Sequence, residues 1–506
     1  MYENGKIYMG LAGDKRVELA LNMCNRHGLI AGASGTGKTV TMKVMAESFS
    51  DAGVPAFLCD VKGDVAGICA PGQSSEGMEK RIDKFGLRDR FVYQGYPTTF
   101  WDVYQEGGHA VRATVSDMGP ELLSRILGLT AVQEGILHIV FQIADDKGLL
   151  LIDLKDLRAM LTYVSEHRTE YMMTYGNITS QSVAAILRAL LPLEQQGGEL
   201  FFGEPALDIH DWMRTAADGR GMINVLDCVK LVQNPTLYAS FLLWMLSELF
   251  EILPEAGDLD KPRMVFFFDE AHMLFRGAPA VLLQKVEQTV KLIRSRGVGV
   301  YFVTQSPSDI PDTVLAPLSN RVQHALRAYT PAELKAVRAA ARAFRPNPAF
   351  QAEDAIMELG VGEALTSFLD EAGVPAMVER TKIICPQSLM SVPEPMVRAK
   401  VMMHDGMEKY DEFVDNVSAY EVLTAEREEA ETAKQEEADR KAREKEEAQA
   451  EKLRLKEEEA ERKRKQKLED EARRKAERRA AKIESQLISA GGQVLKRGLL
   501  GVLKRW

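Results

Sequence analysis

Short apolar runs alternate with segments of helical periodicity through the first 390 residues of the chain. The apolar runs are rich in β-branched and aromatic residues, as expected for strands that are buried on both faces. They cover residues 27–31, 56–60, 222–227, 264–268, 300–304 and 322–328. Strands alternating with helices predict an α/β fold with a mainly parallel sheet that helices cover on both faces.

The segment 107–217 reads differently, because almost all of it has the pattern of helices. Stretches such as VQEGILHIVFQIA and SQSVAAILRALLPLE carry apolar residues at helical spacing. We therefore expect a mainly helical insertion at the sheet edge. It would divide the core into a first part, residues 1–106, and a second part, residues 218–401.

The chain changes character after residue 402, where a linker (402–425) leads into a charged tail (426–484). The tail contains no Gly or Pro and has twenty acidic and twenty basic residues. Acid-first pairs four residues apart, such as Glu437/Lys441 and Glu471/Lys475, favour one long helix. Its few apolar residues keep no heptad, so a sustained coiled coil is not indicated. A solvated spacer is favoured over a helix that binds a specific partner.

The last segment, 485–506, returns to an apolar stripe flanked by Lys496, Arg497, Lys504 and Arg505. Such a basic amphipathic helix can lie on a membrane surface or dock on a neighbouring subunit. Gly498 and Gly501 weaken it as a free helix, which favours docking on a subunit.

Charge and cysteine content narrow the class of protein. The net charge is −10, and the first 425 residues carry 54 acidic against 40 basic residues. This acidic composition does not indicate a broad basic surface for nucleic-acid binding. Any contact with nucleic acid must be local, for example in the pore of a ring. Five cysteines without a CxxC pair, and no signal peptide, predict a reduced cytoplasmic protein without structural zinc.

One short stretch carries a strong phosphate-binding signal. An apolar strand and a helical segment enclose a sequence that matches the pattern G-x-x-x-x-G-K-[ST], namely GASGTGKT. In such loops backbone N–H groups and a lysine hold phosphates, and the hydroxyl after the lysine ligates Mg²⁺. The predicted nucleotide-binding residues are Gly32, Ala33, Ser34, Gly35, Thr36, Gly37, Lys38, Thr39 and Val40. We therefore expect ATP and Mg²⁺ as cofactors, with Lys38 on the terminal phosphates and Thr39 as a metal ligand.

A second apolar run, MVFFF, ends in Asp269 and Glu270. After a complete phosphate loop, this pair predicts a metal-binding Asp269 and a Glu270 that activates the attacking water. Neighbouring His272 fits a packing or capping role and is not assigned to catalysis.

The third candidate is Gln305, which ends the predicted strand 300–304 and has an amide that can sense a terminal phosphate. Four arginines near the last two strands are candidates for stabilising the transition state in a neighbouring subunit: Arg294, Arg296, Arg321 and Arg327. Taken singly, each also fits a surface ion pair. The turn Lys62-Gly63-Asp64 after strand 56–60 fits either a role at the metal or a simple turn.

The order GASGTGKT, DVKGD, FFFDEAH and RSRGVGVYFVTQSPSDIP resembles the HerA/FtsK superfamily of ring-forming ATPases. Within it, the chain is most similar to HerA-like helicase proteins with a charged tail, the YjgR-like group. The resemblance implies a RecA-like P-loop NTPase core, a homohexameric ring, and ATP-driven pulling of a polymer, usually double-stranded DNA. It also implies that Arg294 is the arginine finger, with Arg296 and Arg321 as rivals.

One departure from that family affects the expected function. Proteins of the archaeal HerA type begin with a small β-barrel, and too few residues precede Gly32 for one here. A role in DNA-end resection is therefore not implied, and ring assembly must depend on the core. Alternatives to a DNA motor are a polypeptide-translocating, membrane-associated motor of the secretion type and an ATP-gated oligomeric scaffold.

Overall fold

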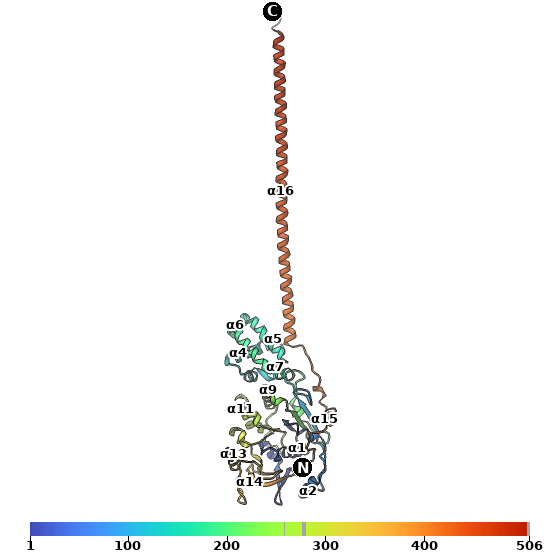
Figure 1. Cartoon of the computed structure of the whole chain (residues 1–506), viewed down its shortest axis with the longest axis vertical. Coiled ribbons are helices and arrows are strands. Elements are labelled where there is room, and N and C mark those ends of the chain that lie inside the picture. Colours follow the sequence, from blue (N-terminus) through green and yellow to red (C-terminus); the bar gives the residue numbers. More distant parts are fainter. Residues whose placement is uncertain (258, 276–279, 503–506) are drawn as a thin grey trace. The chain divides into compact units, whose positions relative to one another are not determined.

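The structure is a computed structural model that describes residues 1–257, 259–275 and 280–502 (Figure 1). The chain divides into two compact units, Met1–Leu423 and Thr424–Trp506. No helix in the described part of the chain is long and apolar enough to cross a membrane.

Within the described residues, thirteen strands form one sheet in the first unit. The strand order is β1-β2-β13-β12-β11-β4-β10-β9-β5-β8-β6-β7, and β3 pairs with β2. The strands are β1 (Tyr2–Glu3), β2 (Lys6–Ala12), β3 (Lys15–Ala20), β4 (Gly28–Ala31), β5 (Ala56–Asp60), β6 (Thr98–Asp102), β7 (His109–Ala110), β8 (Ile223–Asp227), β9 (Met264–Phe268), β10 (Val298–Thr304), β11 (Asn320–His324), β12 (Glu363–Ser367) and β13 (Glu379–Ile383). From β11 to β7 all pairings are parallel, and the strands beyond β11 are antiparallel.

The predicted α/β fold with a mainly parallel sheet is confirmed. Each of the six predicted strands overlaps an observed one, although β11 ends at His324, four residues before the predicted end. The antiparallel extension was not predicted, because its strands are short or lie next to charged residues. Its N-terminal members, β1 to β3, add to the sheet edge.

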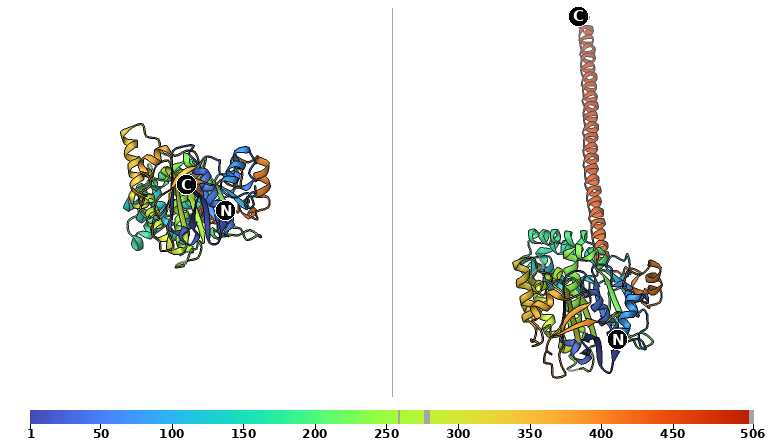
Figure 2. Two further views of the ribbon diagram at one scale, coloured as in Figure 1. Left: turned by 90° about the horizontal axis from the view of Figure 1, so that it is seen from below. Right: turned by 60° about the horizontal axis from the view of Figure 1, so that its bottom comes forward.

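Helices lie on both faces of the sheet (Figure 2). They are α1 (Lys38–Asp51), α2 (Glu76–Lys84), α3 (Val115–Ile126), α4 (Ala131–Lys147), α5 (Leu154–Glu166), α6 (Arg168–Tyr175), α7 (Ser180–Gln195), α8 (Gly198–Phe201), α9 (Pro235–Ile252), α10 (His272–Phe275), α11 (Ala280–Leu292), α12 (Asp312–Leu315), α13 (Pro331–Arg342), α14 (Ala352–Glu358) and α15 (Pro395–Met402). Side chains alternate along β9: Phe266 joins the core with α9 and α11, and Phe267 joins the core with α1. This alternation is the period-two pattern of a strand buried on both faces.

The segment predicted as a helical insertion contains α3 to α8, and α4 to α7 gather at one end of the first unit (Figure 1). It also contains β7, which pairs with β6 at the sheet edge. The limits 107 and 217 remain a prediction.

The predicted long C-terminal helix is present as α16 (Ala419–Val502). Every residue from 425 to 489 is exposed, which agrees with the charge of this segment and its lack of an apolar seam. The basic amphipathic segment 485–506 lies largely outside the described residues, since side chains from 490 onward are not described. Its proposed docking role stays a prediction.

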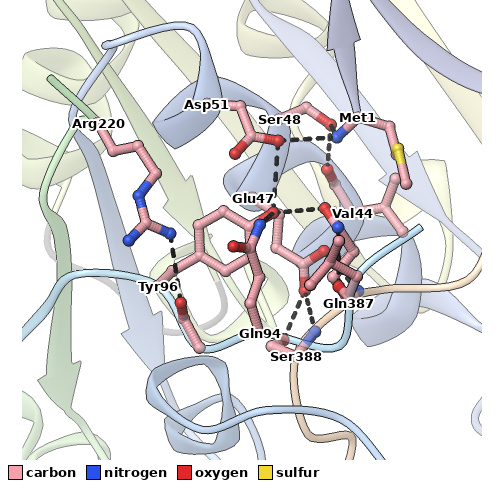
Figure 3. A network of polar contacts seen from close by, with 12 residues as sticks. Met1, Val44, Glu47, Ser48, Asp51, Gln94, Tyr96, Arg220, Gln387 and Ser388 are labelled. Carbon is pink, nitrogen blue, oxygen red and sulfur yellow. Dashed lines mark hydrogen bonds and ion pairs between the residues drawn. The ribbon is translucent and has the colours of Figure 1, made fainter. Parts of the chain in front are cut away.

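The helix that follows the phosphate loop is pinned by a buried carboxylate. Glu47 of α1 accepts hydrogen bonds from the backbone N–H groups of Gln387 (2.8 Å) and Ser388 (3.0 Å), and from the Ser388 hydroxyl (2.5 Å) (Figure 3). Burial raises its pKa, and these donors oppose that rise. The contacts tie α1 to the segment after β13, which fixes the helix at one end while its other end faces the loop.

Residues 403–423, predicted as part of the linker 402–425, are bound along the first unit, and we call them the strap. Met407, Tyr410 and Ala419 in the strap are almost fully buried. His109 of β7 contacts two strap carboxylates, with Nδ1 2.7 Å from Asp411 and Nε2 3.1 Å from Asp405. The imidazole, only 1% exposed, thus clamps the strap to the sheet edge.

We expect this clamp to weaken as the pH rises. Burial alone would lower the pKa of His109, but the hydrogen bonds that its ring donates to Asp405 and Asp411 outweigh burial and raise the pKa above its ordinary 6.5. The contribution of protonated His109 to stability is therefore complete below pH 6.5 and lost as the pH rises through the raised value. Hydrogen exchange of the strap amides, corrected for intrinsic rates, should accelerate as the pH rises above 6.5 through the raised pKa of His109. In His109→Gln this acceleration should be absent; equal pH profiles in both proteins would contradict the expectation.

Candidate nucleotide-binding site

The phosphate loop connects β4 to α1 at the carboxyl edge of the parallel strands. The chain leaves the sheet after Ala31, and α1 begins at Lys38 with Gly37 as its N-cap. Gly32 has φ +155°, and a Cβ placed there would lie 2.5 Å from the Cβ of His324, so only glycine fits. Gly37 has φ +118°, again a conformation that favours glycine. The loop therefore wraps the N-terminus of α1, whose free N–H groups and dipole attract anions.

Lys38 lies inside this loop. Its ammonium donates to the carbonyls of Gly32 (2.8 Å) and Ala33 (3.2 Å), and the side chain is 6% exposed. Burial lowers the pKa of Lys38, and the charge of Glu270 opposes that effect. Among the other predicted loop residues, Thr36 is buried while Ser34 and Gly35 are exposed. Thr39 and Val40 are half-buried in the first turn of α1.

His324, at the end of β11, packs against Gly32 of the loop. It was not predicted from the sequence. Its Nδ1 lies 2.9 Å from the Glu363 carbonyl, and its Nε2 lies 2.8 Å from the Thr41 hydroxyl of α1. Since a carbonyl only accepts, Nδ1 carries the proton and Nε2 accepts from Thr41. Burial lowers the pKa of His324 to about 4, so the imidazole is neutral. No motif marks this residue; only its place at a strand end could have drawn attention to it.

Asp269 follows β9 beside the loop and is 3% exposed. Burial and then the charge of Glu270 raise its pKa to about 7. Its Oδ2 is buried without a hydrogen-bond partner among the described residues. A buried carboxylate oxygen without a donor is costly unless a cation binds it.

Glu270 is held from two sides. Its Oε1 is paired with the ammonium of Lys62, and its Oε2 accepts from the Gln305 amide at 3.2 Å. Burial would raise the Glu270 pKa, but the Lys62 bond and charge, with Gln305 and Lys38, outweigh it and lower the pKa. The residue has φ +46°, a strained conformation for a side chain other than glycine.

His272 lies near this carboxylate without bonding to it. Its Nδ1 is 3.2 Å from Glu270 Oε2 and forms no hydrogen bond there.

The structure thus brings four predicted residues to one sheet edge: Lys38, Asp269, Glu270 and Gln305. Strand register explains this, because Thr304 of β10 pairs with Ala31 of β4, and Phe302 pairs with Phe268 of β9. Lys62, whose role is open from the sequence, is in contact with Glu270.

Arg294 is not part of this cluster. It belongs to the 3₁₀ turn Ile293–Arg296 that precedes β10, and so it lies at the amino edge of the sheet, opposite the loop. Its charge acts on His27, just before β4, which agrees with that location.

The other three candidate arginines, of which Arg296 and Arg321 were the rivals of Arg294, make contacts elsewhere. Arg296 stacks on Phe250 with 4.1 Å between guanidinium and ring centroid, Arg321 donates to the Leu318 carbonyl (3.0 Å), and Arg327 donates to the Leu359 carbonyl (3.0 Å). No sequence motif indicates these contacts.

The residues present fit a nucleotide with Mg²⁺. Nowhere in the described residues do three or more His, Cys, Asp or Glu side chains form a metal site by themselves. Magnesium in phosphate-transfer sites typically takes one or two protein oxygens and completes its shell with phosphates and water. Thr39 and the unpartnered oxygen of Asp269 are suited to that mode.

A RecA-like sheet, a complete phosphate loop after β4 and an acidic pair after β9, with β10 between the two strands, define a P-loop ATPase. The chain matches the family model described as "Helicase HerA-like C-terminal" over residues 8–506. It belongs to this family and is an ATP-hydrolysing enzyme, so the resemblance seen in the sequence is confirmed.

Solved structures with a similar fold have low sequence identity to this chain. Plasmid coupling protein TrwB in complex with the non-hydrolysable GTP analogue GDPNP is 13% identical, with 77% of this chain and 93% of that chain covered and a TM-score of 0.52. VirB4 of Thermoanaerobacter pseudethanolicus is 17% identical, with coverage of 78% and 99% and a TM-score of 0.47. Among curated proteins, none matches the chain significantly. At these identities the likeness to TrwB shows the fold alone.

Replacing the buried carboxylate of Asp269 should change stability and activity in opposite directions. Asp269→Asn removes a buried charge that has no donor on Oδ2, so we expect the free energy of unfolding to rise by about 1 kcal/mol or more. ATP hydrolysis should fall by roughly 100-fold or more, because we expect Asp269 to hold Mg²⁺. Thermal unfolding and steady-state hydrolysis measure the two effects. A variant that is both less stable and fully active would refute this role of Asp269.

Proposed function

We propose that this chain is the subunit of a hexameric ATP-driven motor that translocates double-stranded DNA. The observation that carries the proposal is the convergence of Lys38, Asp269, Glu270 and Gln305 at one edge of the sheet. The family description, helicase HerA-like, supports the choice of cargo.

In this proposal the chain's own residues perform distinct parts of ATP hydrolysis. Lys38 neutralises the terminal phosphates, and Glu270 takes a proton from a water that attacks the γ-phosphorus. The bond from that phosphorus to the β–γ bridging oxygen breaks, and ADP and phosphate leave. Gln305, bonded to Glu270, orients the carboxylate. Mg²⁺, bound to the phosphates with Asp269 and Thr39 nearby, would neutralise charge on the phosphate oxygens.

The position of Arg294 supports a ring. At the amino edge of the sheet it is far from the phosphate loop of its own subunit. A heterologous interface that closes into a ring presents one surface of each subunit to a different surface of the next. We infer that Arg294 completes the site of the neighbouring subunit.

DNA is favoured over a polypeptide cargo only through the family description. The charge of residues 1–425, with 54 acidic against 40 basic residues, places any DNA contact in a local surface such as the ring pore. The protein would act in the cytoplasm, where DNA and ATP meet.

If the protein is a DNA motor, its rate of ATP hydrolysis should depend on DNA and on the salt concentration. Long duplex DNA should stimulate turnover, and the apparent DNA affinity should fall at least about ten-fold between 50 and 200 mM salt. The measurement is steady-state ATPase activity across a DNA and salt series. Lys38→Ala should abolish turnover, and Lys15→Ala, which removes an exposed Lys–Glu pair between β3 and β13 in the antiparallel part of the sheet, should leave it unchanged. Turnover indifferent to DNA would reject the cargo, and a cargo screen with unfolded polypeptide would then test the secretion-type alternative.

Mixed rings test the role of Arg294 in the neighbouring site. Alone, Arg294→Ala and Lys38→Ala proteins should both be inactive, since an arginine finger contributes roughly 10³-fold or more to the rate. Mixed in equal amounts and reassembled, they form roughly one intact interface in four, so partial activity should return. Arg327→Ala serves as the matched control and should remain active alone. Failure of the mixture to regain activity would assign the finger to another residue.

A further inference from the structure

A short turn after β5 places Lys62 at the site. Asp60, the last residue of β5, accepts hydrogen bonds from the backbone N–H groups of Gly63 (2.7 Å) and Val65 (3.1 Å). Asp60 is 2% exposed, and Gly63 has φ +78°. These contacts fix the direction in which the chain leaves the strand, so Lys62 is carried toward Glu270 by a rigid turn.

Lys62 occupies an oxygen that catalysis requires. Its ammonium is paired with Oε1 of Glu270, while Oε2 accepts from Gln305 at 3.2 Å. A general base must offer one oxygen to the proton of the attacking water. Lys62 and Gln305 each take one acceptor position of the carboxylate, so the ion pair makes Lys62 a competitor of water for Oε1 and holds Glu270 in one orientation.

Lys62 is also placed to meet the nucleotide. Its side chain is 46% exposed, whereas its partner Glu270 is 3% exposed, so the lysine is the partner free to move. The charge of Lys62 contributes to lowering the Lys38 pKa, which places the two ammonium groups near each other. Lys38 faces the phosphate loop, so Lys62 borders the position of the terminal phosphate. Asp269 and Asp64 are the other charges that act on Lys62.

We propose that Lys62 is a sensor of the γ-phosphate, which exchanges its ion pair with Glu270 for one with the terminal phosphate of ATP. This inference rests on the ATPase function proposed above. With ADP there is no γ-phosphate, and Lys62 stays on Glu270. With ATP the more highly charged phosphate attracts the ammonium, and Oε1 of Glu270 becomes available to water. Hydrolysis is thereby restricted to a site that holds a triphosphate.

Nucleotide affinities without DNA test the exchange. The probes are ADP and the non-hydrolysable ATP analogue AMPPNP, each measured by titration calorimetry with Mg²⁺. In Lys62→Ala the preference for AMPPNP over ADP should fall about ten-fold or more, because a charge-assisted contact with the γ-phosphate is lost. ADP affinity should change by less than about three-fold. Lys62→Arg should restore most of the preference, since it keeps the charge.

The competing carboxylate gives a second, opposite readout. Glu270→Gln removes the competitor for Lys62, so the preference for AMPPNP should rise several-fold above that of the wild type. In the double variant Lys62→Ala/Glu270→Gln this gain should vanish. A lysine that merely supports the fold would not produce a gain that depends on it.

The matched control is Lys15→Ala, which removes an exposed lysine, 68%, paired with Glu379 in the antiparallel part of the sheet. It should leave both affinities unchanged. An unchanged AMPPNP preference in Lys62→Ala, or a gain in Glu270→Gln that survives loss of Lys62, would overturn the proposal. Failure of the motor function is separate: it would appear as wild-type protein that binds neither nucleotide, or that hydrolyses ATP without response to DNA.

Discussion

Parallel hydrogen bonding between β4, β10, β9 and β5 is the constraint on which this site depends. Parallel strands all end at the same edge of the sheet. The residues that follow β4, β5, β9 and β10 therefore lie together there, although Gly32 and Gln305 are far apart in the chain. The phosphate loop extends β4, the acidic pair extends β9, Gln305 extends β10 and the Lys62 turn extends β5. A shift of one strand by one residue would turn the side chains of that strand to the opposite face and take its end residue out of the site.

Several charged groups at the site are buried at a cost in free energy, and a bound nucleotide with Mg²⁺ would reduce that cost. Asp269 keeps a buried oxygen without a donor, and Lys38 is buried against carbonyls with its pKa lowered. Glu270 adds a strained backbone conformation. The surrounding frame sustains these costs, because Glu47 and the neutral His324 hold the two ends of α1 in buried hydrogen bonds. A protein that optimised stability alone would not keep this arrangement.

Much of this could be predicted from the sequence, because the strongest signals are local. The loop GASGTGKT needs its glycines wherever it occurs, and the run MVFFF followed by two acids marks a central strand end. The antiparallel strands were missed because several are short or charged, and because β13 joins β2 through pairs distant in the chain, such as Lys382 with Leu11.

Side-chain contacts between residues distant in the chain were the least predictable feature of the structure. Lys62 and Glu270 are separated by 207 intervening positions, and nothing in DVKGD says which carboxylate the lysine meets. His324 and His109 carry no motif, since their roles come from burial beside particular partners. The sequence of the strap, polar and without periodicity, resembles a linker; its anchors Met407 and Tyr410 are single residues whose burial depends on a surface built elsewhere.

The strap also determines where the chain can be shortened. Ser418 bonds Asp156 through its hydroxyl, the Tyr420 N–H donates to the same carboxylate at 2.9 Å, and Leu423 is 7% exposed. The charge pattern suggests a boundary at residue 402. A chain cut there would lose the buried side chains of Tyr410 and Ala419 and expose the surface that they cover. His109 would also lose its partners Asp405 and Asp411. A tail-free protein that retains its core must therefore extend through Leu423, inside the first turns of a helix whose remaining length is exposed.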